Sequence, residues 1–346
     1  MDMYKSLRNL LFLLSPESAH YISMKSLKVI CNTCLGKSLV KAAFQPKSIQ
    51  KTQIAGLQFP NRVGLAAGFD KNANYLTALE ALGFGHVEIG TVTPLAQSGN
   101  PKPRLFRLKK DEALINRMGF NNEGATAIAA RLADWRKKNP NTQLLIGGNI
   151  GKNKVTPNEN AWMDYEKCFE ALHAYVDYFI INVSSPNTPG LRELQEKDSL
   201  KKIFASLQEN KLQQKNKKPL LLKIAPDLTN TQVDEVIDLA IEMKLDGLVI
   251  SNTTISRENL LTNQATIEKI GAGGLSGKPV KEKSTALLKY VSKKTNNSIP
   301  LIASGGIMNA EDAKEKIEAG ATLVQIWTGF IYNGPGLIKS ISSKLN

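Results

Sequence analysis

The chain has 346 residues, 42% of them hydrophobic and 22% charged, so it has the composition of an ordinary globular protein, and its length allows two domains or one large α/β barrel. Three cysteines give no disulfide framework, and the Cys31-x-x-Cys34 pair lacks the second pair or histidine cluster that a zinc site needs. The net charge of +14 is consistent with solvated lysine-rich faces, an anionic membrane surface, anionic ligands or nucleic acid, and nucleic acid is the weaker option because no RNA-binding module of aromatic and basic residues is present.

Residues 1–44 predict a pair of short, basic, amphipathic helices ahead of the main domain. Leucines recur at helical spacing in the first helix, at Leu7, Leu10, Leu11 and Leu14. Ser15-Pro16-Glu17 then supplies an N-cap, a proline at the first helical position and an acid in the first turn. The apolar run 10–14 is far shorter than the roughly 20 residues that span a bilayer, and it does not resemble a signal peptide. Such helices either lie in a membrane interface or pack on the main domain, and the residues alone favour neither.

Short apolar runs alternate with amphipathic stretches after a polar linker around Gln45–Gln53. They predict eight strands, at Arg62–Ala67, His86–Gly90, Leu144–Ile150, Tyr178–Val183, Pro219–Ile224, Asp246–Ile250, Pro300–Ser304 and Leu323–Trp327. Helical patterns lie between most of them, for example at Asn74–Leu82, Asn122–Lys138, Thr231–Lys244 and Ala310–Ala319. Eight apolar strands separated by helices favour a closed (β/α)8 barrel over residues 45–346 rather than an open doubly wound sheet.

Two connections are longer than a βα unit needs, Thr91–Gln143 and Asn252–Ser298. The first contains Arg104–Leu108, a turn at Lys109–Glu112, and then Ala113–Ile115. This pattern predicts a β-hairpin inserted on the rim of the barrel.

Every predicted strand ends in glycine, an amide, a hydroxyl or lysine. The residues at these ends are Ala67, Gly68 and Lys71, Gly90 and Thr91, Asn149, Asn182 and Ser185, Lys223, Ser251, Asn252 and Thr253, Gly305 and Gly306, and Trp327 and Thr328. Each such end is an ordinary strand terminator when taken alone. A barrel, however, gathers all eight at one mouth, which is where barrel enzymes carry out catalysis.

The stretch Asn182–Gly190 is the richest of these ends. Asn182 ends a buried strand, and Ser184, Ser185 and Asn187 lie in the loop beyond it, which Pro186 and Pro189 stiffen. Polar groups on a stiff loop at the carboxyl end of a strand are well placed to contact a ligand. The alternative is a turn that only caps its own backbone.

The last two strand ends predict a phosphate site. Ser304-Gly-Gly-Ile307 follows the seventh strand and Thr328-Gly-Phe-Ile331 follows the eighth. Backbone N–H groups at these two ends commonly bind phosphate in barrels. The glycines do not distinguish FMN from another phosphoester.

Metal and hydrolase chemistry are disfavoured. His20, His86 and His173 are scattered along the chain, and no strand end presents a carboxylate cluster. No histidine falls at a strand end and no G-x-S-x-G elbow is present. A bound cofactor is therefore expected to carry the chemistry, while the protein supplies orientation and a base.

Nine blocks of sequence, in order along nearly the whole chain, resemble the dihydroorotate dehydrogenase family in its membrane-associated class 2 form. They are 64–71, 88–94, 102–108, 115–122, 149–153, 182–192, 223–227, 273–277 and 305–307. The class 2 resemblance rests on Ser185, where class 1 has cysteine, and on the N-terminal helices, which class 1 lacks. It implies that residues 1–44 are a membrane and quinone-entrance segment.

The resemblance implies a site residue by residue. FMN would be bound by Ala67, Gly68, Lys71, Thr91, Asn149, Asn182, Lys223, Ser251, Gly277, Gly306, Trp327 and Thr328. Dihydroorotate would be bound by Lys71, Asn116, Arg117, Met118, Gly119, Phe120, Asn182, Asn187, Asn252 and Thr253. Ser185 falls on the catalytic base, and His20 and Arg107 on the quinone entrance. No metal and no nucleic acid are expected.

The implied reaction is oxidation of dihydroorotate to orotate in pyrimidine biosynthesis. Ser185 would take the C5 proton while the C6 hydride passes to flavin N5, and the electrons would then pass to a membrane quinone. A serine hydroxyl is a poor base at neutral pH, so it needs a proton relay. The expected location is peripheral, on an anionic membrane surface at the cytoplasmic face of a bacterial inner membrane.

Two positions depart from the family pattern, and two other functions compete. Trp327 stands where the family usually has tyrosine, and Ser251 replaces a threonine. Another FMN barrel, such as a dihydrouridine synthase, would use the positive charge for tRNA. A non-catalytic barrel would instead be a binding module for membrane surfaces.

Overall fold

The computed structural model describes residues 3–47 and 50–345 and contains the predicted closed barrel. Eight parallel strands pair around it in the order β10-β12-β13-β3-β4-β7-β8-β9. Their bounds are β3 Val63–Asp70, β4 His86–Val92, β7 Leu145–Ile150, β8 Tyr178–Asn182, β9 Leu220–Ile224, β10 Gly247–Ile250, β12 Leu301–Ser304 and β13 Leu323–Ile326. All eight predicted strands are confirmed within a few residues. The largest difference is at β3, which continues past Ala67 because Asp70 still pairs with Ile89 of β4.

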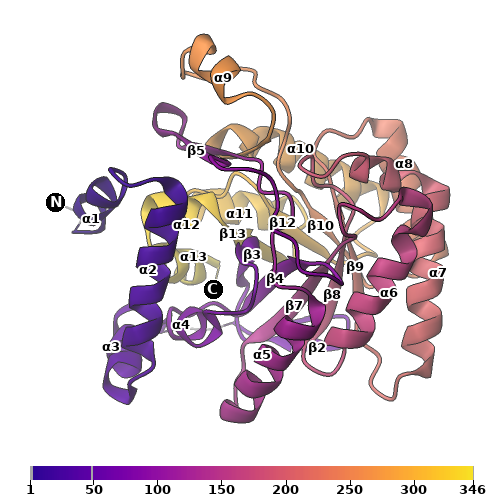
Figure 1. Ribbon diagram of the computed structural model, residues 1–346, viewed down its shortest axis with the longest axis horizontal. Coiled ribbons are helices and arrows are strands. Elements are labelled where there is room, and N and C mark those ends of the chain that lie inside the picture. The colour runs from indigo at the N-terminus through magenta and orange to yellow at the C-terminus, as the bar shows by residue number, and fades with distance from the viewer. Residues whose placement is uncertain (1–2, 48–49, 346) are drawn as a thin grey trace.

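Helices surround the barrel between successive strands (Figure 1). They are α4 Leu76–Ala81, α5 Ala125–Lys138, α6 Ala161–Leu172, α7 Lys197–Gln213, α8 Asn230–Glu242, α9 Gln264–Ile270, α10 Lys281–Lys294, α11 Ala310–Glu318, α12 Thr328–Asn333 and α13 Gly336–Leu345. Helix α5 begins three residues later than predicted, because the Asn122 carboxamide accepts from the Gly124 N–H and holds a turn there. Both faces of each strand are therefore covered, which explains their continuous apolar character.

A short hairpin, which was not predicted, closes the amino end of the barrel and begins at the end of the predicted linker around Gln45–Gln53. It consists of β1 Thr52–Ile54 and β2 Leu57–Phe59, joined through Ala55 and Gly56, both with positive φ. The Phe59 ring contacts His86 and Tyr178, with centroid separations of 5.3 and 5.9 Å. This end of the barrel is thus filled by side chains.

The predicted rim hairpin is present, but it forms part of a three-stranded sheet. Strands β5 Leu105–Leu108 and β6 Ala113–Asn116 pair as expected, and β11 Gly274–Gly277 adds to β6. The register places Leu275 opposite Ile115. The two long connections of the chain therefore meet, and they build one wall above the mouth of the barrel.

Three helices, rather than two, precede the barrel: α1 Met3–Leu11, α2 Pro16–Cys31 and α3 Cys34–Phe44. The predicted cap is confirmed, since Ser15 accepts from the Ser18 N–H at 3.2 Å. These helices lie together at one side of the barrel (Figure 1) and are attached to it by Glu17–Arg104 and Lys37–Glu80 ion pairs. Within the described residues no helix has the length and apolar character needed to cross a bilayer.

Candidate functional site

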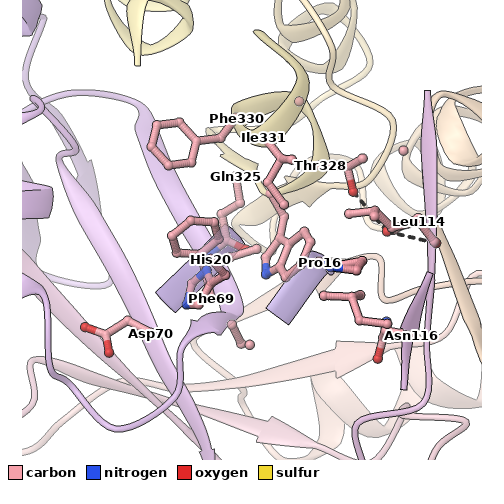
Figure 2. A pocket seen from close by; sticks show the side chains of 18 of the residues that line it. Pro16, His20, Phe69, Asp70, Leu114, Asn116, Gln325, Thr328, Phe330 and Ile331 are labelled. Carbon is pink, nitrogen blue, oxygen red and sulfur yellow. Dashed lines mark hydrogen bonds between the residues drawn. The ribbon is translucent and has the colours of Figure 1, made fainter. Parts of the chain in front are cut away.

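A cavity of about 810 Å³ lies at the carboxyl ends of the barrel strands. Strand ends form its floor, the rim sheet and the loop before Asn122 form one wall, and α1, α2 and α12 form the opposite wall. Figure 2 shows His20, Phe69 and Phe330 on one side, with Leu114 and Asn116 across from them. The cavity falls within the size range of cofactor and ligand pockets.

The structure brings nearly all of the predicted site residues to this cavity. Those that line it are Ala67, Gly68, Lys71, Thr91, Asn116, Met118, Gly119, Phe120, Asn182, Ser185, Asn187, Lys223, Ser251, Asn252, Thr253, Gly277, Gly306, Trp327, Thr328, His20 and Arg107. Asn149 is buried just beneath it. Arg117 is directed elsewhere, since its guanidinium donates to the carbonyls of Pro103 and Ile270. The predicted substrate contact of Arg117 therefore has no side-chain geometry to support it.

Five amide and hydroxyl side chains form a continuous network in the floor, joined at Asn182, whose Oδ1 accepts from Ser184 Oγ at 3.2 Å. Thr91 Oγ1 donates to Asn149 Oδ1 at 2.6 Å, and Asn182 Nδ2 donates to Thr91 Oγ1 at 2.8 Å. Asn252 Nδ2 donates to Ser184 Oγ at 2.9 Å. Because each group is held by another, the network offers donors and acceptors in fixed directions to a polar ligand.

A buried charged cluster below the floor joins the predicted Lys223 to Glu88 and Gln325, which were not predicted as site residues. The Lys223 ammonium lies 3.3 Å from Glu88 Oε2, and Gln325 Nε2 donates to Glu88 Oε1 at 2.5 Å. Glu88 is fully buried, and the ion pair compensates its charge. Gln325 Oε1 has no partner among the described residues, and Gln325 lines the cavity. An unsatisfied buried acceptor of this kind indicates a ligand donor.

Lys71 places a positive charge on the cavity wall without a carboxylate partner among the described residues. Its ammonium donates to Asn121 Oδ1. Burial, aided by the charge of Arg104 and opposed by that of Glu17, lowers the pKa of Lys71 to about 7. Such an ammonium gains an ion pair when an anion enters, so this wall suits a ligand carboxylate.

The loop that carries Ser185 is tied down from two directions. Asn187 Nδ2 donates to Asn116 Oδ1 at 2.9 Å, which joins the loop to the opposite wall. Arg192 donates to the carbonyls of Ser184 and Thr253, both at 3.1 Å, and pairs with Asp227 at 3.0 Å. Arg192 was not predicted as a site residue. It acts through backbone carbonyls, which no sequence pattern reveals.

Thr188 is a second residue of this loop that was not predicted. It lies three positions beyond Ser185 and is 4% exposed. Its hydroxyl has no hydrogen-bond partner among the described residues. Buried hydroxyls are normally satisfied by protein or by ordered water, so Thr188 Oγ1 is available to a water beside the loop.

The wall built by the N-terminal helices has a different character. Leu7 and Leu11 line the cavity from α1, Phe12 from the turn that follows it, and Met24 and Leu27 from α2. Burial, reinforced by the charge of Lys71, lowers the pKa of His20 to about 4, so its imidazole is neutral at physiological pH. The Arg107 guanidinium lies 4.4 Å from the Phe12 ring centroid and donates to the Leu14 carbonyl at 2.7 Å. This entrance is mainly apolar, and the guanidinium of Arg107 is held beside it.

Glycines with positive φ shape the remaining surface at Gly68, Gly277 and Gly306. At Gly306 an added Cβ would lie 2.2 Å from the Lys281 Cα, so only glycine fits. Thr328 Oγ1 donates to Ser276 Oγ at 2.9 Å across the same end of the cavity. Closely packed backbone beside hydroxyls is a suitable surface for a phosphate group.

Fold and site together define an enzyme of the (β/α)8 barrel class with one elongated cavity, polar at the strand ends and apolar toward the N-terminal helices. The family model for dihydroorotate dehydrogenase matches residues 49–346. A dihydroorotate dehydrogenase (quinone) of Christiangramia forsetii is 53% identical over 345 residues, 99% of this chain and 98% of that protein. The corresponding protein of Teredinibacter turnerae is 45% identical over 349 residues, again 99% and 98% of the two chains.

Structural similarity agrees with the sequence comparisons. The crystal structure of the Eimeria tenella enzyme in complex with ferulenol matches with a TM-score of 0.84 at 38% identity, covering 95% of this chain and 90% of that one. The chain belongs to the dihydroorotate dehydrogenase family. Its full-length similarity to quinone-dependent members places it in class 2.

Proposed function

We propose that this chain oxidises dihydroorotate to orotate at an FMN bound in the mouth of the barrel, with Ser185 as the base, and that a quinone is the final electron acceptor. The reaction, a step of pyrimidine biosynthesis, is that of the quinone-dependent dihydroorotate dehydrogenases to which the chain is similar along its length. The observation that carries the proposal is the single cavity that joins the Ser185 loop and the asparagine network to an apolar entrance.

The cavity fits FMN. Gly68, Gly277 and Gly306 let the backbone approach a flat ring or a phosphate. The unpartnered Gln325 Oε1 can accept a hydrogen bond from the cofactor. Ala67, Lys71, Thr91, Asn182, Lys223, Ser251, Trp327 and Thr328 would complete the binding surface, with Asn149 supporting it from beneath. When bound, FMN supplies the acceptor for the substrate hydride. The buried Lys223 ammonium stabilises the negative charge that accompanies reduction.

Ser185 removes the C5 proton of dihydroorotate through its Oγ. Its loop is pinned by Asn187 and Arg192, so the hydroxyl is held in position for the substrate. Because a serine hydroxyl needs a partner to accept its proton, the unpartnered Thr188 hydroxyl of the same loop would take up that proton and pass one on toward solvent. Ser185 is itself 6% exposed, which limits competing solvent.

Lys71 and the asparagines hold the substrate. The Lys71 ammonium pairs with the substrate carboxylate, and Asn116, Asn182, Asn187 and Asn252 bond the ring amides. Met118, Gly119, Phe120 and Thr253 close the pocket around it. Arg117 would not bind the substrate through its side chain; it holds the loop that carries Met118 and Gly119 by donating to the Pro103 and Ile270 carbonyls.

Residues 1–44 form the membrane-facing part of the molecule, and 45–346 the catalytic barrel. Large apolar side chains on α1 and the following turn are exposed, among them Leu10 at 64% and Leu13 at 78%. Together with the basic residues of the segment they suit peripheral binding to an anionic membrane, here the cytoplasmic face of a bacterial inner membrane. The quinone then enters the cavity past His20 and Arg107.

A single anaerobic titration tests the proposal. Purified protein should show a flavin absorbance spectrum that bleaches on addition of dihydroorotate and returns when a short-chain quinone is added. Protein that stays colourless when FMN is supplied would contradict the cofactor. A flavin spectrum that dihydroorotate leaves unchanged, combined with specific tRNA binding, would instead support a dihydrouridine synthase.

A further inference from the structure

Lys316 of α11 is a fully buried lysine that does not line the cavity. It is 1% exposed, and its ammonium makes three hydrogen bonds. The acceptors are the Lys281 carbonyl at 3.2 Å, Ser284 Oγ at 2.5 Å and Thr285 Oγ1 at 2.6 Å. All three acceptors lie within the first five residues of α10. This end of α10 is directly behind the Gly305–Gly306 turn, because Gly306 packs against the Lys281 backbone.

The charge of Lys316 has no ion-pair partner among the described residues. The nearby carboxylates of Asp312 and Glu315 pair with Lys281 instead, at 2.6 and 3.0 Å. Lys316 lies in the last turn of α11, where the helix dipole favours a cation, but its ammonium reaches the first turn of α10, which is the positive end of that dipole and disfavours one. Burial lowers the pKa of Lys316 to about 7, which reflects the same unfavourable setting. A buried cation without an ion-pair partner costs free energy, so the position of Lys316 behind the Gly305–Gly306 turn needs an explanation.

Ser284 connects Lys316 to the cavity wall. Because Ser284 Oγ accepts from Lys316, its own proton is free for a carbonyl. The Gly305 oxygen, at 2.9 Å, is nearer than the Lys281 oxygen at 3.1 Å, which already accepts from Lys316 and Thr285. The Gly305 carbonyl therefore points back toward α10. In a planar trans peptide the N–H points opposite to the C=O, so the Gly306 N–H is directed away from α10.

The side that faces away from α10 is the cavity, which both Gly305 and Gly306 line. No acceptor for the Gly306 N–H occurs among the hydrogen bonds of the described residues. A backbone donor fixed in this way, with no protein acceptor, is what a ligand phosphate requires.

We propose that Lys316 is a positioning residue for the phosphate of FMN, acting through Ser284 to hold the Gly305–Gly306 peptide with its N–H directed at that phosphate. This inference rests on the proposed function, because it takes FMN as the occupant of the cavity. Lys316 does not touch the phosphate. It fixes the donor and adds positive potential from behind, and its effect is therefore confined to the phosphate end of the cofactor.

Comparing FMN with riboflavin, which lacks the phosphate, isolates this effect. The full-length apoprotein is titrated with each flavin, and dissociation constants are measured by fluorescence quenching. Lys316→Met should weaken FMN binding by about tenfold or more and change riboflavin binding by less than about twofold, because the lost hydrogen bonds involve a charged donor. Ser284→Ala removes the hydroxyl that links Lys316 to the Gly305 carbonyl. It should change the ratio of the FMN and riboflavin dissociation constants in the same direction, by a smaller amount. Lys314→Met removes an exposed lysine from the same helix and should change neither constant.

The outcomes separate the two hypotheses. If Lys316→Met binds FMN as tightly as wild type, or loses affinity for both flavins equally, the positioning role is wrong and the FMN site still stands. If wild-type apoprotein binds FMN no better than riboflavin, the proposed phosphate site fails and the role of Lys316 fails with it. Should Lys316→Met not fold, the FMN-to-riboflavin ratio of Ser284→Ala decides in the same terms.

Discussion

The two ends of the cavity are built on opposite principles. At the floor, polar groups of several strands hold one another, as in the Thr91–Asn149–Asn182 network and the Lys223–Glu88 pair. At the entrance, apolar side chains of α1 and α2 make up most of the wall, and the polar residues beside them include the neutral His20 and the fixed Arg107. The floor comes from the barrel, whereas the entrance comes mainly from the N-terminal segment.

The difference follows from what each end has to bind. A polar heterocycle must be oriented, so its partners are fixed in advance by hydrogen bonds and their supporting residues. An apolar oxidant needs only a dry passage of suitable width and a route from the membrane. Substitutions at the floor should therefore change the reduction of the flavin, and substitutions at the entrance should change its reoxidation.

The largest expected effect is at the floor. Ser185→Ala removes the proposed base while leaving the cofactor surface intact, so flavin content and orotate binding should persist. The rate of flavin reduction by dihydroorotate, measured by anaerobic stopped flow, should fall about 10²–10⁴-fold. Reoxidation by a short-chain quinone, started from chemically reduced enzyme, serves as the matched control and should not change.

A reduction rate for Ser185→Ala within about threefold of wild type would show that Ser185 is only a turn residue, since loss of a general base costs far more. Ser184 would then be the next candidate. Its hydroxyl, however, already accepts from Asn252, which leaves it less free to act as a base.

At the entrance the expected effect is smaller, and it falls on membrane binding and quinone reduction rather than on flavin reduction. Leu10→Glu with Leu13→Glu places two charges on the exposed apolar face, where each leucine would otherwise be buried in the membrane interface. Co-sedimentation with anionic vesicles should weaken by at least about tenfold, and reduction of a long-chain quinone should fall with it. Flavin bleaching by dihydroorotate should be unchanged.

The control for these charges is Leu212→Glu, at a residue 70% exposed on α7 at the far side of the barrel. It should leave vesicle binding at the wild-type level. If the doubly substituted protein still sediments normally, Leu10 and Leu13 play no part in membrane binding, and the membrane-binding surface lies elsewhere.

The sequence was most informative about the barrel. Apolar runs such as Tyr178–Val183 are specified locally, and the helices between them leave few alternative topologies, so the strand ends could be assigned to one mouth in advance. The short β1–β2 hairpin was missed because strands of three residues in a polar stretch carry almost no periodic signal. The third N-terminal helix, Cys34–Phe44, was also missed, although Thr33 caps it through the Gly36 N–H.

What escaped prediction in the site depends on contacts between distant parts of the chain. Strand β11 joins β6 across more than 150 positions, and Gln325 meets Glu88 across 237. Arg192 acts on backbone carbonyls, which look alike in any sequence. Periodicity and turn chemistry describe neighbours, so residues that support the site from a second layer become visible only once the fold is known.

The smallest expected effect concerns Lys71, which was predicted to contact both the cofactor and the substrate. Its pKa of about 7 in the free protein, lowered first by burial and then by the charge of Arg104, means that the ammonium is partly deprotonated near neutral pH. Only the protonated form pairs with the carboxylate of orotate, and binding raises the pKa. Orotate affinity should therefore be highest below about pH 7 and should fall by up to about tenfold per unit as the pH rises above it.

Titration of the oxidised flavoprotein with orotate, followed by the flavin difference spectrum, measures this affinity. Because no proton is removed from orotate, the result does not depend on Ser185. Lys71→Met should bind orotate weakly, with no such slope. A wild-type affinity that stays constant between about pH 7 and about pH 9 would mean that the bound flavin keeps Lys71 protonated throughout, and that its low pKa belongs to the empty cavity alone.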